Sequence, residues 1–127
     1  MILVDSSIWI DHLRKGDRQL VVLLTFGRVL CHPFVIGEIA LGHLPQRSTI
    51  IGSMEDLPKA TVSTDHEVRR FIDDNALHGQ GIGYVDAHLL ASVKLTPGSS
   101  LWTRDKRMLA AAAGSGVPLA HPMALPQ

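Results

Sequence analysis

Short apolar runs alternate along the chain with segments whose apolar residues recur every three or four positions. The short runs predict strands at 2–4, 29–31, 100–103 and 117–119, with a weaker candidate at 61–62. The longer periodic segments predict helices at about 6–13, 20–26, 34–41, 49–57, 64–77, 84–95 and 106–113. Strands that alternate with helices pair in parallel and are covered on both faces. The pattern therefore predicts an α/β fold, a three-layer α/β/α sandwich.

Capping residues support these helix boundaries. Thr64 and Glu67 stand three positions apart, which is the spacing of a capping box. Asp17 can cap the helix at 20–26, and Pro33 suits the first turn of the helix that follows it. Gly114 is the expected end of the last helix.

Length and composition narrow the class of protein. The 127 residues suffice for one compact domain, which we expect to span 1–127. The single cysteine, Cys31, excludes an internal disulfide, and the N-terminus does not resemble a signal peptide. No apolar run approaches the roughly 18 residues of a membrane span. We therefore expect a cytoplasmic protein with no membrane segment.

Net charge argues against a generally basic nucleic-acid binder. Twelve basic and twelve acidic residues cancel. Any contact with a nucleic acid must then come from local clusters of charge. Most of the acids have a structural explanation as helix caps or helix-surface ion pairs, and four do not.

Two of these four acids follow predicted strands. Asp5 ends the strand at 2–4, and Asp105 comes shortly after the strand at 100–103. Ligands of open parallel sheets bind outside the carboxyl ends of the strands. Each acid alone is better explained as a helix cap. Together they point to a site at this edge if the two strands are neighbours.

The other two acids lie within predicted helices, among apolar residues. Asp86 is followed by Leu89, Leu90 and Val93 at helical spacing. Glu38 has Val35 three positions before it in the same way. A carboxylate on a buried helix face is costly without compensation, and neither helix offers an arginine at suitable spacing. These positions favour a functional role over a structural one.

Four carboxylates in one pocket require protons or a cation. Two carboxylates about 4 Å apart repel by roughly 4 kcal/mol at an effective dielectric near 20. No set of cysteine and histidine residues has zinc-site spacing, and oxygen ligands alone suit Mg²⁺ or Mn²⁺. Such an ion supports the hydrolysis of a phosphodiester.

Four segments of the chain resemble those of a known protein family. The chain is similar to PIN-domain ribonucleases, and more narrowly to VapC-type toxins of type II toxin–antitoxin systems. The resemblance covers essentially the whole chain and rests on four segments in order: Ile-Leu-Val-Asp5-Ser6-Ser7-Ile-Trp-Ile, Val35-Ile-Gly-Glu38-Ile, Gly83-Tyr-Val-Asp86-Ala-His-Leu-Leu-Ala and Leu101-Trp-Thr103-Arg-Asp105.

The resemblance implies a five-stranded parallel sheet of order 3-2-1-4-5. It implies a Mg²⁺- or Mn²⁺-dependent endoribonuclease that leaves a 3′-hydroxyl and a 5′-phosphate, inhibits translation, forms a homodimer and is neutralised by a small antitoxin. Asp5, Glu38, Asp86 and Asp105 correspond to the catalytic acids, with the metal on Asp5, Asp86 and Asp105. Ser6 and Thr103 correspond to hydroxyls that orient carboxylates or water.

The sequence departs from this pattern at one position. Where many relatives carry a further acid, two residues past Asp105, this chain has Arg107. We therefore expect one firmly bound ion and a second only when RNA phosphate is present. Arg104, Lys106 and Arg107 are candidates for holding the RNA backbone, and solvated surface charge explains them equally well.

Two other functions are compatible with a chain of this size and fold. A phospho-receiver domain has similar size and fold, but it needs an acidic pair after the first strand, where Asp5 stands alone. A PIN-fold module that binds RNA or protein without cleaving it remains open, and the presence of all four acids argues against it.

Overall fold

A computed structural model describes residues 1–121, and the last six residues of the expected 1–127 domain lie outside the described part. Seven helices and three strands follow one another along these residues. In chain order they are β1 (Ile2–Val4), α1 (Ser6–Lys15), α2 (Arg18–Thr25), β2 (Val29–Leu30), α3 (Pro33–Ala40), α4 (Arg47–Glu55), α5 (Asp65–Asp74), α6 (Tyr84–Leu95), β3 (Ser100–Trp102) and α7 (Lys106–Ser115).

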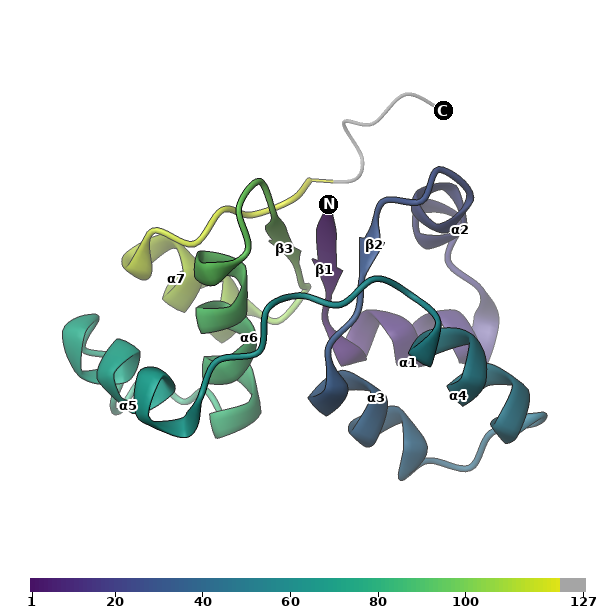
Figure 1. Cartoon of the computed structure of the whole chain (residues 1–127), viewed down its shortest axis with the longest axis horizontal. Coiled ribbons are helices and arrows are strands. Elements are labelled where there is room, and N and C mark those ends of the chain that lie inside the picture. The colour runs from purple at the N-terminus through teal and green to yellow at the C-terminus, as the bar shows by residue number, and fades with distance from the viewer. Residues whose placement is uncertain (122–127) are drawn as a thin grey trace.

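The strands form a parallel sheet of order β2-β1-β3. Helices α1 to α4 lie on one side of it and α5 to α7 on the other, and the connection from α4 to α5 passes across the strands (Figure 1). The predicted α/β class with a parallel sheet is therefore correct.

The prediction of five strands is wrong, because the two outer positions hold only single bridges. Lys59 pairs with Cys31 beside β2, and Leu119 pairs with Leu101 beside β3. The succession of segments thus follows the order 3-2-1-4-5, but only the inner three are strands. Pro58 and Pro118 precede the two bridging residues, and proline has no N–H with which to extend a ladder. The weaker strand candidate at 61–62 is not a strand either.

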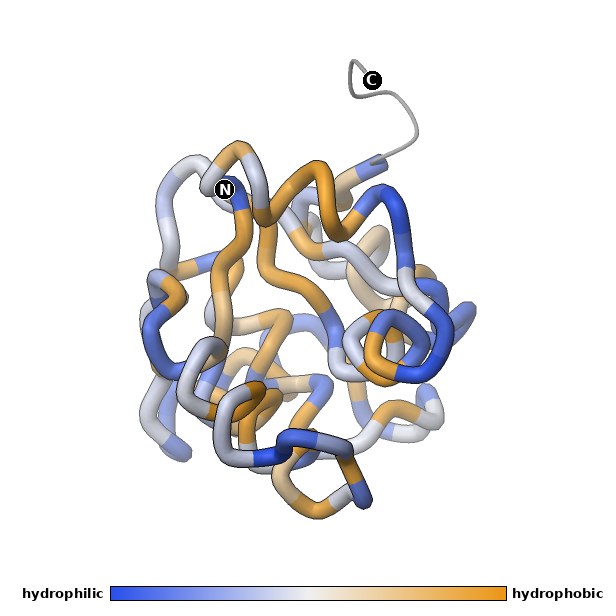
Figure 2. Tube along the Cα trace, turned by 90° about the vertical axis from the view of Figure 1, so that its right-hand side faces the viewer, coloured by the Kyte–Doolittle hydropathy of each residue, from blue (hydrophilic) through white to orange (hydrophobic). Residues whose placement is uncertain are grey.

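The sheet is the centre of the core. All three residues of β1 are buried, and Leu3 and Leu101, partners in neighbouring strands, have no exposed surface. Leu89 and Leu90 of α6 are equally buried. The hydrophobic colour accordingly follows the segments through the middle of the molecule, while hydrophilic colour gathers at turns on its edge (Figure 2). Across residues 1–121, no helix is long and apolar enough to cross a membrane.

Most predicted helix caps are present. Thr64 and Glu67 form both hydrogen bonds of the capping box, at 3.1 and 2.8 Å. The Asp17 carboxylate accepts from the Leu20 amide at 3.0 Å and begins α2. Two helix ends were misplaced. Helix α5 ends at Asp74 and not near Leu77. Helix α7 passes Gly114 and ends at Ser115, before Gly116, whose φ of 70° allows the left-handed turn.

Candidate active site

Asp5 and Asp105 lie at neighbouring strand ends, as predicted. Val4 pairs with Trp102 in the sheet, and the Asp5 amide donates to the Trp102 carbonyl at 3.0 Å. Asp5 is buried, with 5% of its surface exposed. Asp105 follows β3 and caps α7, where its Oδ1 accepts from the amides of Arg107 and Met108 at 2.8 and 3.1 Å. The parallel sheet therefore delivers two carboxylates to one edge.

Helices α3 and α6 supply the other two acids. Asp86 is half-buried in the first turn of α6, where its Oδ2 accepts from the Gly83 amide at 3.2 Å. Glu38 is exposed, so the prediction that it lies on the buried face of its helix was wrong. Val35 and Ile39 form the buried face of α3, and Glu38 lies beside that face at the solvent boundary.

The four carboxylates lie near enough to one another for their charges to interact. Burial raises the pKa of Glu38; the Ser6 hydroxyl partly offsets this, and the charges of Asp5 and Asp86 raise the pKa further. Burial also raises the pKa of Asp86, against the hydrogen bond from Gly83, and the charges of Asp5 and Asp105 add to the rise. The structure thus brings together the four acids that the sequence singled out.

Hydroxyl groups orient the buried carboxylate. Oδ2 of Asp5 accepts hydrogen bonds from Thr103 Oγ1 at 2.8 Å and from Ser7 Oγ at 3.1 Å. Thr103 therefore acts on the carboxylate of Asp5 and Ser6 on that of Glu38, as expected of hydroxyls that orient carboxylates. Sequence reasoning missed Ser7. It also missed Gly83, which the N-cap to N3 spacing from Asp86 could have revealed.

The hydrogen bonds leave one oxygen of each aspartate available. Within residues 1–121, the bonds to Asp5, Asp86 and Asp105 all reach a single oxygen of each carboxylate. In the same part of the chain, no lysine, arginine or histidine forms an ion pair with any of the four acids. Repulsion among these carboxylates is therefore not offset by a basic side chain.

The donor set fits a hard divalent cation, although the ligands are not preassembled. Among the described residues, no three acidic, histidine or cysteine side chains converge closely enough to hold a metal ion as they stand. Carboxylate oxygens of this kind are the ligands that Mg²⁺ and Mn²⁺ prefer.

Two of the three basic residues considered for RNA contact are engaged within the protein. Arg104 lies within 4 Å of the carboxylates of Asp11 and Asp17. Arg107 donates to the Gly81 carbonyl at 3.4 Å. Lys106 is exposed and makes no ion pair in the described part of the chain, and its role stays a prediction.

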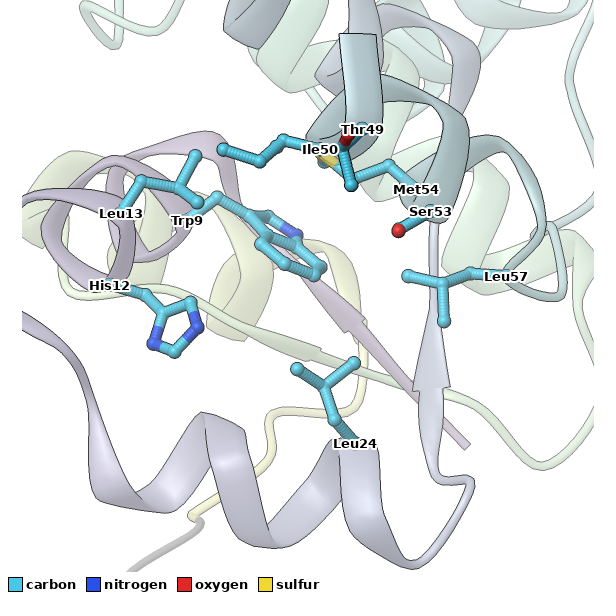
Figure 3. A pocket seen from close by; sticks show the side chains of 9 residues that line it. All are labelled: Trp9, His12, Leu13, Leu24, Thr49, Ile50, Ser53, Met54 and Leu57. Carbon is cyan, nitrogen blue, oxygen red and sulfur yellow. The ribbon is translucent and has the colours of Figure 1, made fainter. Parts of the chain in front are cut away.

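A separate apolar pocket of about 200 Å³ lies among α1, α2 and α4. Figure 3 shows the Trp9 indole in its middle, facing Leu24 from α2 and the side chains of α4. The indole nitrogen Nε1 is buried and has no hydrogen-bond partner among residues 1–121. The pocket is therefore lined mainly by apolar side chains. The remaining lining residues are His12, Leu13, Thr49, Ile50, Ser53, Met54 and Leu57.

Comparison with solved structures supports the fold. The chain matches the crystal structure of FitAcB from Neisseria gonorrhoeae with a TM-score of 0.65, covering 98% of this chain and 100% of that one. The two share 18% sequence identity, so this likeness concerns the fold alone. No protein-family model matches the chain. The chain is therefore an α/β protein of the same fold as that structure, with acids at the carboxyl edge of its parallel sheet.

Two curated relatives define the family. The chain is 50% identical over 121 residues to Ribonuclease VapC32 from two strains of Mycobacterium tuberculosis, CDC 1551 / Oshkosh and ATCC 25618 / H37Rv. Each alignment covers 95% of this chain and 98% of the relative. The chain therefore belongs to the VapC family of PIN-domain ribonucleases.

Proposed function

We propose that this protein is a Mg²⁺- or Mn²⁺-dependent endoribonuclease and the toxin of a toxin–antitoxin pair. One observation carries the proposal: four carboxylates lie near one sheet edge, and burial together with their mutual repulsion raises the pKa of Glu38 and Asp86. Such a cluster is costly in the free protein and is stabilised by a cation. Membership of a ribonuclease family makes RNA the expected substrate.

The acids divide into two roles. Asp5, Asp86 and Asp105 would hold the ion through the oxygens that the protein leaves free. When bound, the ion would lower the pKa of a water molecule and offset charge on the scissile phosphate. Glu38, at the solvent boundary with a raised pKa, would accept the proton that this water loses. The 3′-oxygen would leave, take a proton from solvent and become a hydroxyl, and the phosphate would remain as the 5′-phosphate of the downstream fragment.

Neutralisation requires a partner, and we propose a small antitoxin in that role. The pocket around Trp9 supports this, because its mainly apolar lining would accept an apolar side chain of a partner. We also propose a homodimer, which rests on the family resemblance alone. In the cell, RNA cleavage by the free toxin would inhibit translation until the antitoxin binds.

Cleavage of RNA by the purified protein tests this function. We expect cleavage with Mg²⁺, none with EDTA, and 5′-phosphate ends in the products. Asp105→Asn should abolish it while the asparagine oxygen still caps α7, so loss of folding does not explain the result. Asp73→Asn, on the exposed surface of α5, is the matched control and should cleave normally. Persistent cleavage by Asp105→Asn would contradict the assignment.

A further inference from the structure

Arg104 stands between two residues of the site, yet its side chain reaches away from it. Its Nη2 donates to Asp17 Oδ2 at 2.5 Å, and Nη1 lies 3.5 Å from Asp11 Oδ2. The guanidinium carbon also lies 5.2 Å from the centre of the Trp102 ring. The Arg104 side chain therefore contacts Asp11 in α1, Asp17 just before α2, and Trp102 at the end of β3.

Asp17, one of the two partners of Arg104, is held in place by further hydrogen bonds. Only 13% of the Asp17 side chain is exposed, and its other oxygen caps α2 through the Leu20 amide. The Asp17 amide donates to His12 Nδ1 at 3.0 Å, which ties it to α1. Burial raises the pKa of Asp17, but the hydrogen bonds from Arg104 and from the amides of α2 outweigh burial and lower it. Asp17 is thus a rigid, ionised partner.

This contact differs from an ordinary surface ion pair. Arg70 and Asp74 on α5 lie 3.9 Å apart, with 76% and 68% of their side chains exposed. Pairs of that kind contribute little because water and salt screen them. Arg104, with 44% of its side chain exposed, bridges two carboxylates and lies over an indole, an arrangement that suits the planar guanidinium better than a lysine.

The ion pairs of Arg104 with Asp11 and Asp17 connect segments that adjoin the site. Helix α1 begins directly after Asp5, and Arg104 immediately precedes Asp105. The neighbouring Thr103 already donates to Asp5. We infer that Arg104 is a positioning residue: by bridging Asp11 and Asp17 it fixes the loop that carries Asp105 at its distance from Asp5. The inference rests on the proposed function, because the fixed distance matters for the ion that these carboxylates hold.

Kinetics of Arg104→Met test the inference. The methionine keeps an apolar contact with Trp102 and removes the charge. We expect kcat to fall about 10–100-fold, as for other residues that orient metal ligands. KM should not change. RNA affinity and its dependence on salt, measured in the inactive Asp5→Asn background, should not change either. Arg104→Lys should restore part of kcat, and Arg70→Met, which removes the ordinary surface pair, should leave it unchanged.

Two results would overturn the inference. An unchanged kcat in Arg104→Met would show that the bridge does not position the site. Weaker RNA binding, with a salt dependence reduced by about one charge, would make Arg104 a phosphate contact instead. If the wild type cleaves no RNA, the proposed function fails, and hydrogen exchange decides the inference. The amides of Asp5 and Asp105 should then exchange faster in Arg104→Met, and unchanged rates would refute the bridge.

Discussion

The hydroxyl of Thr103 donates a 2.8 Å hydrogen bond to the carboxylate of Asp5, across 98 positions of sequence. The same hydroxyl accepts from the Asp105 amide at 3.1 Å. One side chain thereby touches both acids that the sheet delivers to its edge. Thr103 is itself buried, so water does not readily replace either hydrogen bond.

Replacing Thr103 with valine should therefore affect the site more than the fold. The substitution keeps the shape and removes both hydrogen bonds, at a cost of about 1–3 kcal/mol in the free energy of unfolding. RNA cleavage should fall about 10–100-fold, because Asp5 loses the group that orients it. Thr103→Ser should recover most of the activity. Equal activity in the valine variant would show that Asp5 needs no such orientation.

Removing one charge from the acid cluster should stabilise the protein in the absence of metal. The pKa of Asp86 is raised on folding, so the folded protein binds this proton more tightly than the unfolded chain. The ionised carboxylate therefore destabilises the fold above its folded pKa. The effect disappears as pH falls below the ordinary value of 3.8.

Asp86→Asn should thus raise the melting temperature at pH 7 in EDTA. Repulsion between partly solvated carboxylates is of the order of 1 kcal/mol, which corresponds to about 3–5 °C. Asp73→Asn should cause no such rise. The difference between Asp86→Asn and wild type should shrink as pH approaches 3.8. A difference that is independent of pH would mean that charge repulsion is not its cause.

His32 should make the stability depend on pH in the opposite sense. Burial, with a contribution from the nearby His88, lowers the pKa of His32 from 6.5 to about 4. The unfolded chain therefore takes up a proton before the folded protein does. Stability is fully present above pH 6.5 and is lost as pH falls toward 4, at roughly 1 kcal/mol or more per pH unit.

His32→Asn provides the comparison for this prediction. His32 Nδ1 accepts from the Phe34 amide at 3.0 Å and caps α3, and the asparagine oxygen can take over that cap. The variant loses packing and should be less stable at pH 7. Its stability should nevertheless change less between pH 6.5 and 4 in urea denaturation. Equal slopes for the two proteins would assign the pH dependence to other groups.

Local signals in the sequence were sufficient for most of the helices and for the inner strands. The capping box at Thr64 and the cap at Asp17 each depend on residues three positions apart, so sequence alone could reveal them. The outer strands could not be judged in this way. A residue such as Leu119 has strand-like neighbours, but whether it forms a ladder depends on hydrogen bonds to a distant segment.

The site was predictable in its acids and less so in its supporting contacts. Asp5 and Asp105 follow from the rule that parallel strands end at one edge, and Asp86 from its place in an apolar helix. Which serine, Ser6 or Ser7, donates to Asp5 depends on a rotation of about 100° around the first turn of α1, which the sequence does not specify. Arg104 pairs with Asp17 and Asp11, which lie 87 and 93 positions away in the sequence, and no local pattern indicates these pairs.

Binding of Mn²⁺ to the free protein tests the central claim most directly, because it needs no RNA. At a concentration of about 100 times its Kd, the ion should stabilise the fold by about 2.7 kcal/mol and raise the melting temperature accordingly. Asp5→Asn combined with Asp86→Asn should abolish that rise, whereas Asp73→Asn should keep it. An equal response to Mn²⁺ in the double variant would show that the four acids do not form the metal site.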